Sequence, residues 1–467
     1  MLVAARTWAF ATGASSLRQD ADSSDKTERK AAPMTAQPEF ALKQQNFSGV
    51  SHLFRANPSH SHVVDVATSG DVRGDVLQEA VDDVLARMPY FADALVEREG
   101  DFFYAENPLP FEVAEGQLRA VGGPETNWHN VDVTYRGDTI SFSMFHALCD
   151  GLGLNLFVEA VLSRYFCRKD GRDYPADGLR VPGSPVLEGE ELDPYSRPYE
   201  LSEGFSLDFF GERYYHLPEV DEAPLDEMRG VSFRVGEGEF MELVRSCQSS
   251  PVATLQVLMA EAVTQVHPEV SETLGALVPS SNRKALNSSN TFKNCAGALR
   301  LPYRPEQMGG LDFAGRCQLA RRLLREANSP DTARFIANNM GGAVRKVGQA
   351  MHSYQEKLQV LNFTKTANND TFMLDYVGGL RSTGFEDQVS SVRYRATTLD
   401  PGFRTDTLYL TATAGFFDIE LVRAFESDVY VGALADQLRR RGISFTQGEE
   451  QSYVTPENGL IRGLGLM

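Results

Sequence analysis

The stretch that decides the fold reads His146-Ala-Leu-Cys-Asp150 and is followed by Gly151. Residues 138–145 before it alternate between apolar and small polar side chains, which predicts a strand. Residues 152–165 after it carry apolar side chains at helical spacing. His146 should therefore lie on the loop that leaves a strand, where a rigid scaffold can present it to a ligand.

Three readings of this stretch follow from the residue types. In the first, His146 is a general base, Asp150 holds the local geometry, and Gly151 permits a turn that a Cβ would resist. In the second, His146 only satisfies hydrogen bonds of the loop, and Asp150 caps the helix that begins near Leu152. In the third, Cys149 is a nucleophile paired with His146, but their spacing is awkward, and Cys149 is better explained as a small apolar filler.

The stretch resembles the His-x-x-x-Asp-Gly signature of the superfamily that contains chloramphenicol acetyltransferase, plant BAHD acyltransferases, alcohol acetyltransferase-like proteins and the condensation domains of peptide synthetases. Three further segments resemble the same superfamily in the same order. They are residues 77–91, a helix ending in an Arg-x-Pro-x-Phe turn; residues 277–284, a strand ending in Arg283; and residues 372–379, a late strand ending in glycine. Together with the signature they extend from about residue 47 to about residue 442, which is nearly the whole chain.

The resemblance implies a fold, a two-lobed α/β sandwich of the chloramphenicol acetyltransferase type with the active-site tunnel between its lobes. Residues 34–215 would form the N-terminal lobe, which carries the signature, and residues 216–467 the C-terminal lobe. Residues 1–33 have no sustained apolar period, and Met34 begins a stretch that reads like a genuine start. We therefore expect residues 1–33 to be a disordered extension or a miscalled start.

The resemblance also implies an activity, the transfer of an acyl group from a pantetheine thioester to an alcohol or an amine. The donor would be an acyl-CoA or an acyl carrier protein, the acceptor a small molecule, and no cofactor would be permanently bound. His146 would be the general base, and Asp150 would support it through a pair with an arginine, for which Arg283 is the candidate. The candidates for lining the tunnel are Thr291, Asn294, Tyr376 and Gly378.

Some of these roles have alternatives. Thr291 and Asn294 are as well explained by hydrogen bonds within their own loop, and Gly378 and Gly379 by close approach of the lobes. The alternative function is a non-catalytic protein of the same fold that binds a ligand or a partner. One departure bears on the choice: Phe145 stands where condensation domains and chloramphenicol acetyltransferase usually carry a first histidine. This favours a stand-alone alcohol or amine acyltransferase over a peptide-forming domain.

Composition excludes several other classes. With a net charge of −19, the chain is not expected to bind nucleic acid through phosphate contacts. No run approaches the roughly 18 apolar residues of a membrane helix, so we expect no membrane span and a cytoplasmic protein. The five cysteines contain no C-x-x-C pair, which argues against a zinc ribbon and a disulfide framework. His52, His60 and His62 lack further ligands at metal-binding spacing, so we expect no metal.

Periodicity also predicts the elements along the chain, as alternating strands and helices on either side of a proline-rich connection over residues 168–220. The expected strands are 63–67, 101–104, 131–135, 231–235, 275–278, 298–303, 372–377, 389–398 and 407–413. The expected helices are 75–88, 237–248, 254–267, 314–327 and a closing helix over 420–440.

Overall fold

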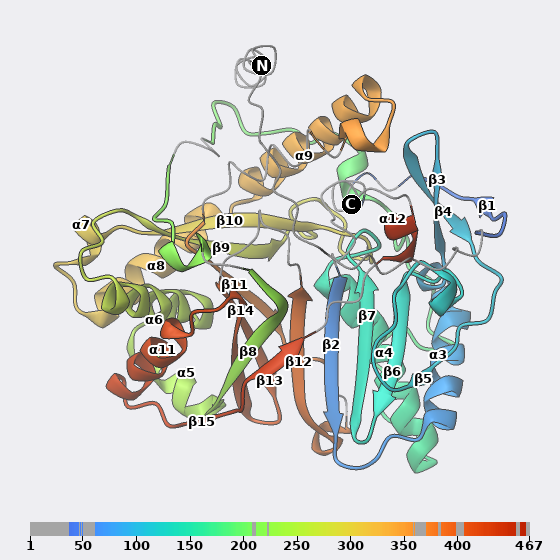
Figure 1. The fold of residues 1–467 in the computed structure, drawn as a ribbon, viewed down its shortest axis with the longest axis horizontal. Coiled ribbons are helices and arrows are strands. Elements are labelled where there is room, and N and C mark those ends of the chain that lie inside the picture. Colours follow the sequence, from blue (N-terminus) through green and yellow to red (C-terminus); the bar gives the residue numbers. More distant parts are fainter. Residues whose placement is uncertain are drawn as a thin grey trace, which may run out of the picture. The chain divides into compact units, whose positions relative to one another are not determined.

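A five-stranded sheet carries the signature loop (Figure 1). Its order is β12 (Val389–Thr397), β2 (Ser61–Thr68), β7 (Thr139–Phe145), β6 (Val131–Arg136) and β5 (Ala114–Glu115). Helices α3 (Gly74–Arg87) and α4 (Gly151–Asp170) contact each other and pack with the sheet in a first hydrophobic core. β7 alternates as expected, and Ile140 and Phe142 are fully buried in that core.

A second, larger sheet lies at the centre of the other lobe. Its order is β10 (Ala296–Tyr303), β9 (Leu274–Ser281), β11 (Phe372–Gly378), β13 (Asp406–Thr413), β14 (Phe416–Phe425), β8 (Pro224–Gly236) and β15 (Phe445–Gln447), and β16 (Gln451–Tyr453) also pairs with β8. The helices that pack with it in a second core are α5 (Glu237–Ser246), α6 (Pro251–Val266), α8 (Phe313–Ala327) and α11 (Val429–Arg440). The predicted mixed α/β architecture is confirmed.

The remaining elements are small, apart from one long helix. A three-stranded sheet joins β1 (Ala41–Leu42), β4 (Asp101–Glu106) and β3 (Ala94–Arg98), and the short helices are α7 (Pro305–Met308) and α12 (Gly459–Gly463). This computed structural model describes residues 37–45, 47, 49, 61–207, 212–221, 224–357, 359, 370–381, 384–397, 406–453 and 458–463, so the predicted extension over residues 1–33 lies outside them. Within these ranges no helix has both the length and the apolar character needed to cross a membrane.

The division of the lobes at residue 215 needs a correction. β12 comes from the second half of the chain but pairs with β2 along its length, with Tyr394 opposite Val64, and so completes the sheet of the first lobe. Val392 and Tyr394 are buried in the first core. Without β12, the backbone of β2 would be left unpaired at a sheet edge, which explains why a strand from the second half of the chain lies there.

The predicted closing helix over residues 420–440 is wrong in its first half. β14 (Phe416–Phe425) occupies that region and pairs with both β13 and β8, and the helix α11 begins only at Val429. Leu421 and Phe425 also fit helical spacing, but Phe417, Ile419 and Leu421 alternate with Asp418 and Glu420, which is the pattern of a strand. The helical interpretation overlooked this alternation.

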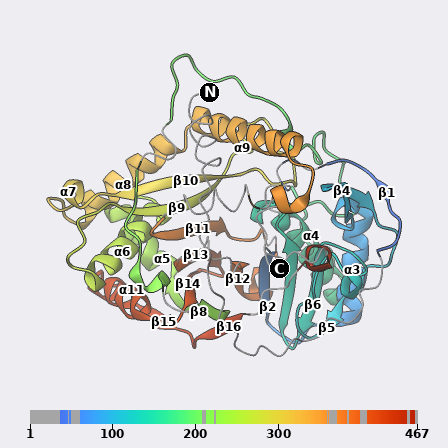
Figure 2. The ribbon, with the colours of Figure 1, turned by 45° about the horizontal axis from the view of Figure 1, so that its top comes forward.

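Periodicity did not predict the long helix α9 (Pro330–Ala350), which lies beside β10 (Figure 2). Its sequence contains three glycines and two asparagines, all poor helix formers. Ile336 packs in the second core and Val344 in the first, so α9 contributes to both. Gly341 is required because a Cβ there would lie 2.4–3.4 Å from the Tyr195 carbonyl group, closer than a side chain can approach. α9 is thus held by packing on both lobes.

Candidate active site

His146 lies at the end of β7, on a short loop that leads into α4. Hydrogen bonds hold this loop: the Tyr104 hydroxyl donates to the Ala147 carbonyl at 2.6 Å, and the Leu148 amide donates to the Phe145 carbonyl at 2.9 Å. Phe145 and residues 147–150 on either side of His146 are buried, whereas His146 itself keeps part of its surface accessible. His146 therefore lies on the loop that leaves the strand, as predicted, and is the accessible residue of that loop.

Two polar side chains lie against the His146 ring. The ring of His62, on the neighbouring strand β2, is centred 4.1 Å away, and Nδ2 of Asn294, from the other lobe, is 3.5 Å from Nδ1 of His146. Burial lowers the pKa of His146 below its ordinary value of 6.5, although the Asp150 charge and hydrogen bonds to the backbone of His146 and Cys149 oppose the shift. The imidazole is therefore neutral at pH 7, which is the form that can accept a proton.

The Asp150 carboxylate accepts four hydrogen bonds from the described residues, none of them from His146. Arg283 donates from Nη1 to Oδ2 at 2.8 Å and from Nη2 to Oδ1 at 2.7 Å, so the predicted pair is present and bidentate. The Cys295 amide donates to Oδ2 at 2.9 Å, and the Gly153 amide to Oδ1 at 2.8 Å. Burial alone would raise the pKa of Asp150, but Arg283 and these amides hold it below its usual value. Asp150 therefore has two roles: it caps the N-terminus of α4, and through Arg283 and Cys295 it links the first lobe to the second.

Arg283 also fixes the loop that carries Asn294. Its Nε donates to the Thr291 carbonyl and its Nη2 to the Lys293 carbonyl, each at 3.1 Å. The Thr291 hydroxyl donates to the Leu192 carbonyl at 2.5 Å and accepts from the Lys293 amide at 3.1 Å. These contacts show Thr291 holding its loop and do not turn it toward His146. Of the two polar residues predicted for this loop, the structure brings only Asn294 to the histidine.

The glycine that the fold requires in this region is Gly153, not Gly151. Gly151 is the first residue of α4 and is not among the residues with positive φ, and a Cβ on it would make ordinary contacts with Val377 Cγ1 at 3.6 Å and His62 Cε1 at 3.8 Å. The expectation that Gly151 permits a strained turn is therefore wrong. A Cβ on Gly153 would overlap the carbonyl oxygen of Phe292, a residue of the other lobe. The backbones of the two lobes therefore approach each other closely at this point.

The predicted residues of β11 do not all reach the histidine. The Tyr376 ring lies 6.5 Å from that of Phe417, in the second core, and 38% of the residue is exposed. Gly378 has φ +82° at an irregularity in the pairing with β13, a conformation that glycine adopts readily. A Cβ on Gly379 would lie 2.7 Å from the Ala412 carbonyl oxygen. This close approach is within the second sheet, so the predicted approach of the lobes does not occur at Gly379.

Comparison with solved structures places this arrangement among known folds. Polyketide synthase associated protein 5 from Mycobacterium tuberculosis has a TM-score of 0.57 at 14% identity, covering 86% of this chain and 98% of that one. TRI3 trichothecene 15-O-acetyltransferase from Fusarium sporotrichioides has a TM-score of 0.58 at 10% identity, covering 89% and 99%. TRI101 from F. sporotrichioides, in complex with coenzyme A and T-2, has a TM-score of 0.55 at 12% identity, covering 86% and 99%. No protein-family model and no curated protein matches the sequence.

The chain has the fold of the CoA-dependent acyltransferases. The resemblance inferred from the His-x-x-x-Asp-Gly signature is thereby confirmed for the fold. At 10–14% identity, the likeness says nothing about the substrate or about the role of any residue.

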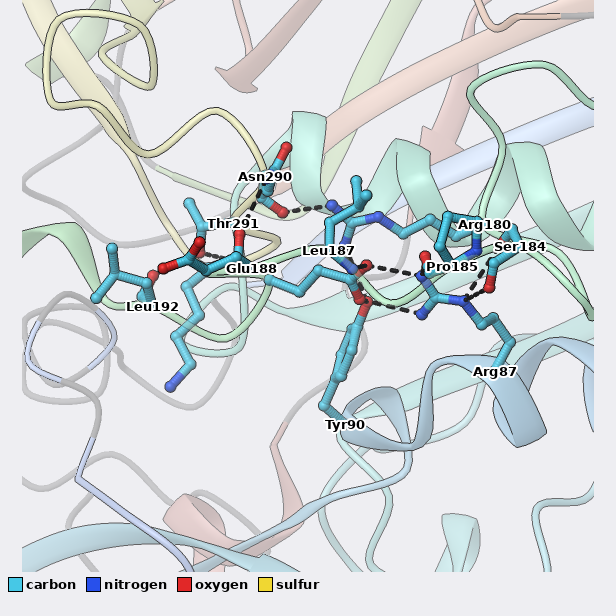
Figure 3. A network of polar contacts seen from close by, with 12 residues as sticks. Arg87, Tyr90, Arg180, Ser184, Pro185, Leu187, Glu188, Leu192, Asn290 and Thr291 are labelled. Carbon is cyan, nitrogen blue, oxygen red and sulfur yellow. Dashed lines mark hydrogen bonds and ion pairs between the residues drawn. The ribbon is translucent and has the colours of Figure 1, made fainter.

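In this acyltransferase fold, the connection between the lobes is clamped to both of them by a buried ionic cluster (Figure 3). Arg87, at the end of α3, pairs with Glu190 of the connection at 2.7 Å, and Tyr90 donates to the same carboxylate at 3.0 Å. These contacts hold the pKa of Glu190 at about 2, against the effect of burial. Arg180 donates to the Tyr90 hydroxyl at 2.9 Å and to the Asn290 carbonyl of the other lobe. The Arg-x-Pro-x-Phe turn of the early helix thus has a structural role.

The remaining candidates do not support another chemistry. Cys149 is fully buried, and burial raises the pKa of its thiol well above the ordinary value, so a thiolate nucleophile is not available at neutral pH. No group of His, Cys, Asp and Glu within the described ranges has the arrangement of a metal site. His52 and His60 lie outside those ranges, and His62 lies on β2 beside His146.

Sequence reasoning did not single out two residues that matter below. His62 was considered only as a metal ligand, although it directly precedes the strand predicted over 63–67, and its place beside His146 depends on the pairing of β2 with β7. Asp375 lies in a predicted strand that is otherwise mainly apolar, and a lone acid in such a strand is the signal that could have singled it out.

Proposed function

We propose that the protein is an acyltransferase that moves an acyl group from a pantetheine thioester, carried by CoA or by an acyl carrier protein, to a small alcohol or amine. The observation that carries the proposal is the placement of His146, which is partly accessible, lies on a hydrogen-bonded loop and meets Asn294 of the other lobe. Asp150 and Arg283 fix the other end of the same loop. A histidine that only stabilised the fold would need no accessible surface.

His146 would act as a general base. As the acceptor oxygen or nitrogen attacks the thioester carbonyl carbon, its proton passes to the unprotonated nitrogen of His146, and a tetrahedral intermediate with an oxyanion forms. When the intermediate collapses, the carbon–sulfur bond breaks and the imidazolium returns the proton to the thiolate. The products are an ester or amide and a free thiol. A base of this kind accelerates a reaction by about 10²–10⁴-fold.

The other residues would position these groups. We assign to Asp150 and Arg283 the placement of the loop, because the Asp150 carboxylate is fully occupied by Arg283 and backbone amides. Among the predicted tunnel residues, Asn294 is the one that lies beside His146, and its amide can donate to the oxyanion or orient the imidazole. For Thr291, Tyr376 and Gly378, the contacts favour supporting roles.

The fold supports the choice of donor. TRI101 has been solved with coenzyme A and T-2, and TRI3 is by its name an O-acetyltransferase. This chain would hold the thioester between its lobes as a co-substrate, with no cofactor that stays bound.

The test is release of free thiol from a panel of acyl-CoAs, with and without alcohol and amine acceptors. The wild type should release thiol, and His146→Ala should lower the rate by about 10²-fold or more while its melting temperature stays close to that of the wild type. His352→Ala, which removes an exposed histidine, is the matched control and should have wild-type activity. Absence of thiol release from the wild type, together with a destabilised His146→Ala, would instead favour the non-catalytic binding protein.

A further inference from the structure

One face of β11 is turned toward the first lobe. Met373 and Val377 pack against the first core, whereas Phe372 and Leu374 are buried in the second. Because side chains alternate along a strand, Asp375 lies on the same face as Met373 and Val377. A carboxyl group therefore stands between two apolar side chains, on a strand of the second lobe that faces the first.

The neighbours of β11 place Asp375 near the loop of His146. Arg381, which follows the strand, binds Glu159 of α4. Val377 lies against Gly151, which is two turns of α4 before Glu159. The end of β11 and the chain that follows it therefore contact α4 at two points. Asp375 lies two residues before Val377, about 7 Å along the strand, and Val377 contacts Gly151, which directly follows the signature loop. The Asp150 charge also acts on the Asp375 carboxyl, so Asp375 lies in the neighbourhood of the loop from His146 to Asp150.

Asp375 has no polar partner among the described residues, since no hydrogen bond or ion pair joins its carboxyl to any of them. The nearby Tyr394 gives its hydroxyl hydrogen to Asn155 Oδ1, at 2.5 Å. Burial, and to a lesser extent the charge of Asp150, raise the pKa of Asp375 to about 7. The side chain nevertheless keeps part of its surface accessible, as His146 does. A desolvated but accessible acid is typical of the wall of an internal binding space.

We propose that Asp375 binds a positively charged nitrogen of the acceptor, so that the natural acceptor is a basic molecule whose ammonium group lies at Asp375 while its nucleophilic oxygen or nitrogen lies at His146. This inference deepens the proposed acyl transfer and rests on it. An unpaired carboxylate in a poorly solvated place is costly, and a cationic ligand is the partner that would compensate it most fully. The apolar Met373 and Val377 on either side would contact the carbon skeleton of such a ligand.

The test uses two alcohols of the same shape that differ only in charge, 2-(dimethylamino)ethanol and 3-methylbutan-1-ol. The amine of the first is tertiary, so it is a cation at neutral pH and forms no stable amide. Binding of each alcohol to the full chain is measured by calorimetry, which requires no turnover. The wild type should bind the amino alcohol at least about 10-fold more tightly, a difference of about 1.4 kcal/mol. Asp375→Asn should remove the preference, and Asp375→Glu, which keeps the charge, should retain much of it.

Asp387→Asn is the matched control, since it removes the same charge from an exposed position and should leave the preference unchanged. Equal affinity of the wild type for the two alcohols, including no binding of either, would overturn the proposal, and so would a preference that survives in Asp375→Asn. The preference found without thiol release from any acyl-CoA would support the cation site while contradicting the acyltransferase. Thiol release without the preference would do the opposite, so the two failures are distinguishable.

Discussion

The pair between Asp150 and Arg283 can be tested by a double-mutant cycle. Both side chains are buried, with 5% and 11% of their side-chain surface exposed, so removing one partner leaves an uncompensated charge. Arg283→Ala should cost about 3–5 kcal/mol of unfolding free energy. Asp150→Ala should cost about 1 kcal/mol more, because it also removes the cap of α4. The double mutant should cost less than the sum of the two, by about 2–3 kcal/mol.

The assay is urea unfolding of the four proteins at neutral pH, followed by circular dichroism. The pKa of Asp150 is depressed in the folded state, so the stability from its ionised form is present above the ordinary value of 3.8 and is lost as the pH falls through the folded value. The coupling should therefore shrink in acid. Arg283→Lys should be intermediate, because lysine keeps the charge and loses the bidentate geometry. Costs that add to within about 0.5 kcal/mol at neutral pH would show that the pair is not coupled.

We expect three further outcomes, two from the structure and one from the sequence. Because burial lowers the pKa of His146, its basic form persists below pH 6.5, and kcat/KM should fall only at a lower pH; a midpoint above 6.5 would contradict the burial argument. Gly153→Ala should lower stability by about 1–3 kcal/mol in urea, because its Cβ overlaps the Phe292 carbonyl, whereas Gly151→Ala should fold normally; equal stabilities would disprove the contact. Deletion of residues 1–33 should leave the melting temperature unchanged, because that stretch has no apolar face for a core, and an insoluble product would refute this.

The spacing of apolar residues predicted most of the helices and strands, because in these elements the apolar residues lie on the face that is buried. The helix expected over 75–88 is α3, Gly74–Arg87, and the strand expected over 389–398 is β12, Val389–Thr397. The failures had two causes. In β14 the alternation of Asp418 and Glu420 with apolar residues was overlooked in favour of a helical spacing that also fits. In α9 tertiary position outweighed local preference, because the helix packs on both lobes despite three glycines. The pairing of β12 with β2 joins residues far apart in the chain, and no local signal specifies it.

The candidate site likewise contains residues that the sequence predicted and residues that it did not. His146, Asp150 and Arg283 were predictable because each lies in a short segment that resembles a known signature. The position of Asn294 beside His146 depends on how Arg283 holds the loop over residues 291–294, which spacing alone does not determine. His62 lies beside the catalytic candidate only because two strands pair in one register.

The placement of β12 has a consequence for synthesis of the protein. When residue 215 has been made, every other strand of the first sheet exists, but the hydrogen-bonding edge of β2 has no partner until residues 389–397 have been added. At ~5–20 residues per second, the ribosome needs on the order of 10–30 s to make the intervening chain. During that interval, the nascent first lobe offers an open edge to which a strand of another nascent chain can add. Newly made protein should therefore aggregate most readily when translation pauses within residues 216–388, and least when a chaperone covers β2 until β12 arrives.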